Sequence, residues 1–288
     1  MQTRELGIPT TQGHILAATE FVPERSNQKT MIISSATGVL QGYYHKFARY
    51  FSTLGYVVYT FDYWGIGKSG GKIDQLKENK FDLKNWGFND QAAMVAFARE
   101  KHPEYELVLL THSVGGQIVG FNPQYREIDK IVMVASQSGY WRYFEGIHQP
   151  KMILFWYAMI PFLTPIYGYF PAKKLGLFEN LPKEMAYEWK RWGKRARYMM
   201  HFYDKNSYFF DRIEAPVLSL SFPRDEYAPQ KAVDWLTAQF TSSNTERLHY
   251  QPHRSALGKL RHFGFFRERF KEELWDLTDR WIRKTSDL

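Results

Sequence analysis

The sequence predicts an α/β fold, with a mostly parallel central sheet of about eight strands and helices on both faces. Short apolar runs at 107–110, 131–135 and 217–220 are typical of strands that are buried on both faces. Helix-like segments alternate with strand-like runs at both ends of the chain, and such alternation favours a parallel sheet. The segment 140–211 lacks this alternation and is rich in Trp, Tyr, Phe and Pro. We therefore expect a core formed by residues 1–139 and 212–288, with an inserted helical cap, or lid, at 140–211.

The individual elements are predicted from the spacing of apolar residues. Further strands are expected at Ile15–Val22, 31–34 and 56–61. A helix is expected at 42–54, where one face would carry Phe47, Tyr50, Phe51 and Leu54. Asp90 is expected to cap a second helix at 91–100. The last helix is predicted from the same spacing in Phe266, Phe270, Leu274, Leu277 and Trp281.

The composition excludes several classes of protein. The 288 residues include no cysteine, which excludes disulfides and thiolate metal sites. The first residues contain no apolar run of the kind found in signal peptides, so we expect a cytoplasmic protein. The net charge is +8, but basic and acidic residues are interleaved and no nucleic-acid-binding motif is present. We therefore expect no nucleic-acid partner.

The most informative motif is Thr-His-Ser-Val-Gly-Gly at 111–116, directly after the apolar run 107–110. A strand that turns sharply at Ser-x-Gly-Gly into a helix exposes the serine hydroxyl as a nucleophile. Ser113 is therefore the candidate nucleophile, and the N–H of Val114, at the helix start, is a candidate oxyanion donor. The simpler interpretation is a glycine-rich turn with a capping serine. Thr111 stands where the G-x-S-x-G pattern has glycine, and its branched side chain could crowd the turn.

A serine nucleophile needs a base, and the base needs an orienting acid. In the order Ser–Asp–His, the acid follows a late strand, which points to Asp225 after 217–220. Glu226 is the alternative acid. His262 is the candidate base, with His249 and His253 as alternatives, whereas His112 is expected to be structural.

These residues resemble the motifs of bacterial α/β hydrolases of the serine-aminopeptidase-like and monoglyceride-lipase-like group, over most of the chain outside 140–211. His-Ser-x-Gly-Gly matches 112–116, Asp-x-x-x-Pro matches 225–229 and His-Phe-Gly matches 262–264. A fourth motif, Asp-x-Arg-Gly-x-Gly-x-Ser, matches 62–69 with Trp64 in place of arginine. The resemblance implies the α/β-hydrolase fold and a catalytic triad of Ser113, Asp225 and His262, with no metal and no organic cofactor.

The second oxyanion donor is expected in the loop 35–39, which follows the strand at 31–34. Hydrolases of this kind usually have His-Gly at the start of this loop, whereas this chain has Ser35-Ala36. By position, the backbone N–H of Thr37 is the best candidate donor, followed by that of Gly38.

The expected cap has two unusual stretches. Residues 152–170 carry no charge and are long enough to span a bilayer, but Pro161, Pro165 and Gly168 argue against one straight helix. We expect instead a buried helix and loop that shape a pocket for an apolar acyl or aromatic group. The basic stretch 183–197 is interpreted either as a solvated face or as a contact site for an anionic group or a membrane surface.

We predict a serine hydrolase that cleaves a carboxylic ester of a small molecule through an acyl-enzyme, with thioesters and amides as less favoured substrates. One alternative is an aminopeptidase-type amide hydrolase, which would need acidic residues to bind the substrate amine. Another is a ligand-binding or membrane-associated module that has lost turnover. The oligomeric state is not predicted.

Overall fold

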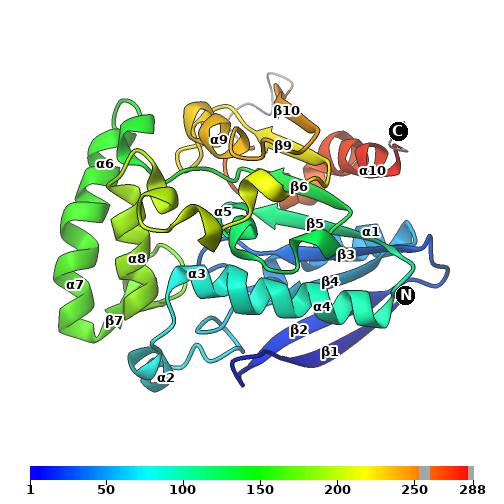
Figure 1. Ribbon diagram of the computed structural model, residues 1–288, viewed down its shortest axis with the longest axis horizontal. Helices are drawn as coiled ribbons and strands as arrows, with labels where there is room; N and C mark the ends of the chain where they lie inside the picture. The colour runs from blue at the N-terminus through cyan, green and yellow to red at the C-terminus, as the bar shows by residue number, and fades with distance from the viewer. Residues whose placement is uncertain (253–259, 285–288) are drawn as a thin grey trace.

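The computed structural model describes residues 1–252 and 260–284, which form one large sheet covered by helices (Figure 1). The sheet order is β1-β2-β4-β3-β5-β6-β9-β10. β2 pairs antiparallel with both of its neighbours, and every other pairing in this sheet is parallel. The predicted fold class, a mostly parallel sheet with helices on both faces, is confirmed. The strands are β1 Gln2–Pro9, β2 Ile15–Val22, β3 Lys29–Ser34, β4 Val57–Phe61, β5 Glu106–His112, β6 Lys130–Val134, β9 Val217–Ser221 and β10 Thr245–His249.

The two faces of the sheet build two apolar cores, because successive strand residues point to opposite sides. One core joins the sheet to α4 and to much of 140–211, and the other joins it to α1 and α10. The helices outside 140–211 are α1 His45–Thr53, α2 Ile73–Glu78, α3 Leu83–Asn85, α4 Ala92–Lys101, α5 Val114–Gln117, α9 Gln230–Thr237 and α10 Asp276–Arg283.

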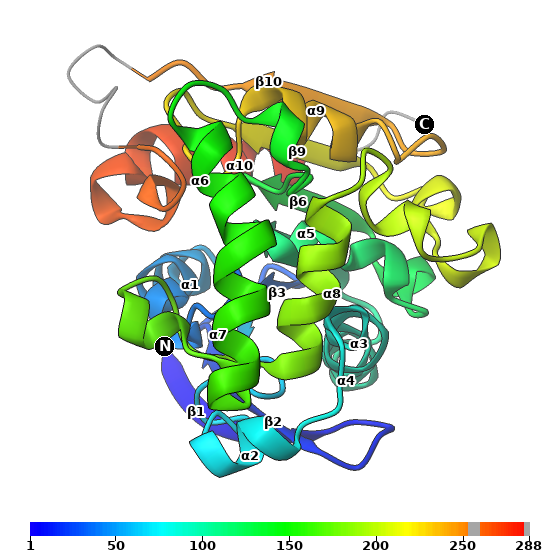
Figure 2. The same ribbon diagram turned by 90° about the vertical axis from the view of Figure 1, so that its left-hand side faces the viewer.

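The segment 140–211 contains α6 His148–Leu154, α7 Ile160–Tyr167, α8 Lys183–Gly193 and a small hairpin of β7 Tyr169–Phe170 and β8 Leu181–Pro182. A π-helical turn, Phe155–Met159, joins α6 to α7 without a break. The helix therefore continues through Pro161 and Pro165 and ends at Gly168, whose φ is 77°. A helix followed by a loop was expected and is present, but the expectation that this helix is buried was wrong, because Phe162 and Ile166 are 69% and 74% exposed. Figure 2 shows α7 and α8 lying across the end of the sheet that is nearest α5.

Two further predictions need correction. Asp90 does not cap a helix: Asp82 caps α3, and a π-helical turn, Trp86–Gln91, leads into α4. Asp90 is instead buried, with its carboxylate 2.8 Å from His14 Nε2. The predicted last helix is divided, because tight turns and a π-helical turn, Lys271–Trp275, precede α10.

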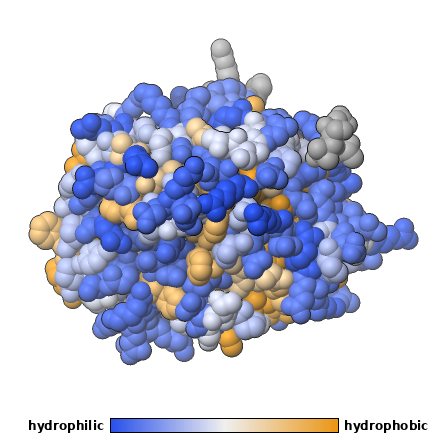
Figure 3. Space-filling model, viewed as in Figure 1, coloured by the Kyte–Doolittle hydropathy of each residue, from blue (hydrophilic) through white to orange (hydrophobic). Residues whose placement is uncertain are grey.

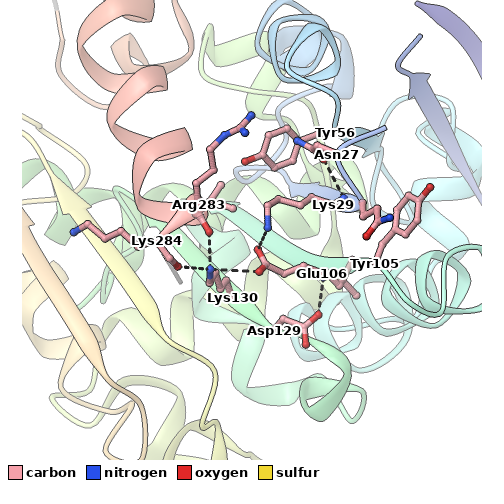
Figure 4. Close-up of polar contacts among 12 residues, drawn as sticks. Asn27, Lys29, Tyr56, Tyr105, Glu106, Asp129, Lys130, Arg283 and Lys284 are labelled. Carbon is pink, nitrogen blue, oxygen red and sulfur yellow. Dashed lines mark hydrogen bonds and ion pairs between the residues drawn. The ribbon is translucent and has the colours of Figure 1, made fainter. Parts of the chain in front are cut away.

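Buried and partly buried charges hold α10 at the end of the sheet where the parallel strands begin (Figure 4). The Lys130 ammonium, 6% exposed, donates to the backbone carbonyls of Ile282 at 2.5 Å and Lys284 at 3.0 Å. Glu106 lies between Lys130 and Lys29, at 3.4 and 3.1 Å. A cation at the carboxyl end of a helix satisfies carbonyls that have no partner within the helix. In Figure 1, β1 begins and α10 ends on the side of the molecule away from α6 and α7.

Candidate active site

Ser113 lies at the turn between β5 and α5, with φ 53° and ψ −114°. This backbone conformation is rare for a residue with a side chain and is found mostly at functional sites. A Cβ atom at Gly115 would lie 2.4 Å from the backbone oxygen of Ser34, and one at Gly116 would lie 2.4 Å from Ser136 Oγ. Strand and helix can approach this closely only because both residues are glycine. Thr111 is accommodated, with its buried hydroxyl 3.3 Å from Ser136 Oγ.

His262 and Asp225 form a buried pair. The imidazole Nδ1 lies 3.1 and 3.0 Å from the two carboxylate oxygens of Asp225. One of these oxygens also accepts the backbone N–H groups of Tyr227 at 2.9 Å and Ala228 at 2.8 Å. These donors fix the carboxylate in the loop after β9. The alternative acid, Glu226, points elsewhere and accepts from the guanidinium of Arg261 at 3.4 Å.

The two alternative histidines do not join this pair. His249 lies on β10, with its Nδ1 2.7 Å from Ser221 Oγ. His253 lies outside the described residues.

The Ser113 hydroxyl lies 3.5 Å from both amide atoms of Gln137, which sequence reasoning missed. The Gln137 Nε2 atom also donates to the backbone carbonyl of Tyr227 at 3.0 Å. Within 1–252 and 260–284, no hydrogen bond joins Ser113 Oγ to His262, although both residues line one cavity. Catalytic hydrogen bonds are often long before substrate binds.

His112 connects three loops around Ser113. Its Nε2 lies 3.0 Å from the backbone oxygen of His262, which can only accept, so Nε2 carries the proton. Nδ1 must then accept from the Tyr44 hydroxyl at 2.9 Å, and the Tyr44 oxygen accepts the Ala36 N–H at 2.9 Å. Burial, and then the charge on His262, hold the pKa of His112 well below its ordinary value. The expected structural role of His112 therefore has a defined geometry.

The two candidate oxyanion donors have free N–H groups. Among the residues described, neither Thr37 nor Val114 donates its backbone N–H to another protein group. Thr37 follows β3, and the Ala36–Tyr44 contact holds its loop. Next to it, the Gly38 carbonyl accepts the N–H of Glu179 at 3.0 Å. The loop is thus fastened both to the core and to 140–211.

A cavity of about 880 Å³ contains Ser113, His262 and Thr37 in its wall. Most of the remaining wall is apolar and comes from 140–211, including Phe144, Met152, Leu154, Phe155, Trp156, Met159, Leu177, Phe178 and Trp189. The charged residues in the wall are Lys151, Lys173 and Glu179, and the last two pair at 2.9 Å. A cavity of this size suits a drug-sized molecule, and its lining favours an apolar one.

Comparison with known proteins agrees with this arrangement. The profile of the family described as serine aminopeptidase S33 matches residues 25–178. The chain belongs to this family of α/β hydrolases. A monoacylglycerol lipase of Mycolicibacterium smegmatis is 31% identical to this S33 family member over 99 residues. That match spans 34% of the chain and 34% of the lipase, about a third of each.

Solved structures of esterases share the fold of this S33 family member at low identity. A thermostable carboxyl esterase from Bacillus coagulans superposes with a TM-score of 0.70 at 13% identity, over 98% of each chain. An esterase from Pyrococcus furiosus superposes with a TM-score of 0.63 at 15% identity, over 98% of this chain and 91% of the esterase chain. Est1E from Butyrivibrio proteoclasticus, with ferulic acid bound, superposes with a TM-score of 0.60 at 15% identity, over 96% of this chain and 97% of Est1E.

Proposed function

We propose that the protein is a serine hydrolase that cleaves carboxylic esters with a large apolar acyl or aromatic group. The observation that carries the proposal is that His262, which is paired with the buried Asp225, lies in the same cavity wall as Ser113, whose backbone is held in a strained turn. A solvated or purely structural serine needs neither a paired imidazole nor such a backbone.

In the proposed mechanism, His262 Nε2 takes the Ser113 proton while Ser113 Oγ attacks the ester carbonyl carbon. Asp225 orients the imidazole and stabilises its charged form. The N–H groups of Val114 and Thr37 stabilise the oxyanion of the tetrahedral intermediate. Its collapse expels the alcohol, which receives the proton from His262. Water, deprotonated by His262, then attacks the acyl-enzyme, and the acid and Ser113 are released.

We propose that 140–211 acts as a cap over this site, inserted into a core of 1–139 and 212–288. The support is the position of α6, α7 and α8 between β6 and β9 in the chain, together with the many cavity-wall residues that the segment supplies. The cap would exclude water from the acyl-enzyme and select the substrate by shape.

The cavity favours an ester over the amine-bearing substrate of an aminopeptidase. A substrate ammonium group needs an unpaired carboxylate, and Glu179 in the cavity wall is paired with Lys173. The curated relative is named a monoacylglycerol lipase, which also supports an ester substrate.

The test is covalent labelling with a fluorophosphonate, read by intact mass, on the wild type and on Ser113→Ala. We expect one adduct on the wild type and none on the variant, followed by hydrolysis of p-nitrophenyl esters by the wild type alone. Equal labelling of both proteins would overturn the assignment of Ser113. No labelling of either would favour the ligand-binding module.

We further propose peripheral contact of the cap with an anionic lipid surface. Phe162 and Ile166 on α7 are 69% and 74% exposed, and apolar atoms protrude at the left edge of Figure 3, where Figure 1 places α7. Lysines lie over tyrosine rings beside this face: Lys194 Nζ lies 4.0 Å from the centroid of the Tyr157 ring, and Lys174 Nζ lies 4.5 Å from that of Tyr167. An apolar face bordered by cations is typical of interfacial helices. In the described part of the chain, no helix is long and apolar enough to cross a bilayer.

The lipid contact is tested by sedimentation with vesicles. We expect binding to phosphatidylglycerol vesicles, weak binding to phosphatidylcholine vesicles, and loss of binding in the double variant Phe162→Ser and Ile166→Ser. A stable dimer that the double variant disrupts, with no vesicle binding, would show instead that the face binds a second copy.

A further inference from the structure

Two tryptophans of the cavity wall have their indole N–H groups bonded to protein acceptors. The indole N–H of Trp156 donates to the backbone carbonyl of Gly139 at 3.0 Å. The indole N–H of Trp189 donates to the Tyr198 hydroxyl at 3.0 Å. The two rings pack edge to face, with their centroids 5.1 Å apart. The tryptophan surface left for a substrate is therefore hydrocarbon.

Tyr198 lies behind this wall and does not itself line the cavity. It is fully buried, and its φ of 45° is unusual for a residue with a large side chain. Its oxygen accepts from Trp189, and because an indole N–H can only donate, the Tyr198 proton remains available. Burial raises the pKa of Tyr198 above its ordinary value, so the hydroxyl retains that proton.

The proton of Tyr198 reaches the helix that follows the nucleophile. The Tyr198 hydroxyl donates to Gln117 Oε1 at 2.9 Å. Gln117 is fully buried and belongs to α5, the single turn that begins at Val114. Tyr198 thus connects Trp189 in the cavity wall to α5, whose first residue, Val114, is a proposed oxyanion donor.

We infer that Tyr198 is a positioning residue that fixes the tryptophan wall of the cavity and thereby determines which acyl lengths the enzyme accepts. The inference rests on the proposed ester hydrolase function. Without the hydroxyl, the Trp189 N–H loses its acceptor. A half-buried N–H without a partner is unfavourable, so the ring turns toward water in the cavity and obstructs a long acyl chain.

The experiment compares kcat and KM for p-nitrophenyl acetate and p-nitrophenyl decanoate in the wild type and Tyr198→Phe. We expect the variant to lower kcat/KM for the decanoate by about tenfold relative to the acetate, mainly through KM. Tyr250→Phe is the matched control, because it removes a hydroxyl that donates to Glu273 at 2.7 Å on the surface. Its ratio of decanoate to acetate activity should equal that of the wild type.

A second variant tests the effect of the tryptophan positions on acyl-length preference while Tyr198 is unchanged. A Cβ atom at Gly193 would lie 2.3 Å from the Trp156 ring, so Gly193→Ala must displace that ring. We expect it also to lower decanoate turnover relative to acetate turnover. An unchanged ratio in Tyr198→Phe, with only a lower melting temperature, would overturn the inference and make Tyr198 a structural residue.

A binding measurement separates this inference from the proposed function. Decanoate is titrated into Ser113→Ala and into Ser113→Ala with Tyr198→Phe, with tryptophan fluorescence as the readout. We expect the Kd for decanoate to rise about tenfold in the double variant. If Ser113 proves unreactive but this rise is observed, the wall inference holds and the hydrolase proposal fails. Equal Kd values would overturn the inference whatever the reactivity of Ser113.

Discussion

The Nε2 atom of His112 donates to the backbone carbonyl of His262 at 3.0 Å, so the residue before the proposed nucleophile holds the loop that carries the proposed base. Tyr44 extends the contact to Ala36, the residue before Thr37. The hydroxyl of Tyr43 donates to the carbonyl of Phe263 at 2.5 Å, which fastens the same loop a second time. The relative positions of nucleophile, base and oxyanion loop therefore depend on a few buried hydrogen bonds.

Tyr44→Phe should lower kcat for ester hydrolysis by about tenfold with little change in KM. The variant leaves His112 Nδ1 and the Ala36 N–H without partners, while the cavity wall keeps its residues. Steady-state kinetics with p-nitrophenyl esters checks the prediction, and His112→Gln, which retains an N–H donor, should keep more activity than His112→Leu. A kcat within twofold of the wild type would contradict it.

Asp225→Asn should lower kcat on the order of 10³–10⁴-fold, because the amide no longer fixes the imidazole in the required tautomer. Glu226→Gln is the matched control. The Glu226 carboxylate pairs with Arg261 at the surface, and its replacement by an amide should leave turnover close to that of the wild type. Equal losses in the two variants would show that the geometry of the Asp225–His262 pair does not matter for turnover.

Gly115→Ala should destabilise the protein by about 1–3 kcal/mol and slow fluorophosphonate labelling of Ser113, because its Cβ would meet the backbone oxygen of Ser34. Backbone cannot move aside as a flexible side chain can. Gly42→Ala, where a Cβ meets nothing within 4 Å, should keep the wild-type free energy of unfolding. Urea denaturation measures the free energy of unfolding of both variants. Equal stability of the two variants would refute the packing argument.

Glu188→Gln should remove a pH dependence of stability. Glu188 is buried on α8, where it accepts the Lys84 N–H at 2.8 Å and the Tyr203 hydroxyl. Burial, and then the charge of Asp82, raise the pKa of Glu188 from 4.5 to about 8, despite Arg191 at 3.9 Å. Between these values the folded state binds more protons than the unfolded state, so stability decreases as the pH rises.

Urea denaturation of the wild type and Glu188→Gln at about pH 5 and about pH 8 tests this sign. The unfolding free energy of the wild type, relative to that of the variant, should be lower at the higher pH. A difference that is independent of pH would mean that Glu188 ionises in the folded state as it does in the unfolded chain.

The sequence predicted the elements whose own residues determine them. The buried strands β5, β6 and β9 are continuous apolar runs, and the Asp225 and His262 loops are recognisable by motif. The edge strands Gln2–Pro9 and Thr245–His249 were missed, because an edge strand is only partly buried and its sequence lacks a strong apolar pattern.

Other features depend on partners that are distant in the chain. Asp90 has the sequence signature of a helix cap but is buried against His14, 76 residues away. The contact of Gln137 with Ser113 and that of Tyr44 with His112 likewise require the folded sheet. No local pattern identifies such pairs, so the candidate triad was predictable and its supporting contacts were not.

The start of β1 and the end of α10 lie on the side away from α6 and α7, which has a practical consequence. A support, a tag or a fused partner joined next to either element would lie on the side of the molecule where the parallel strands begin, near Lys130. The helices α6 and α7, which contribute to the cavity wall, would then lie on the opposite side of the molecule. Immobilised in this orientation, the protein would leave α6 and α7, the helices of the proposed cap, free of its attachment.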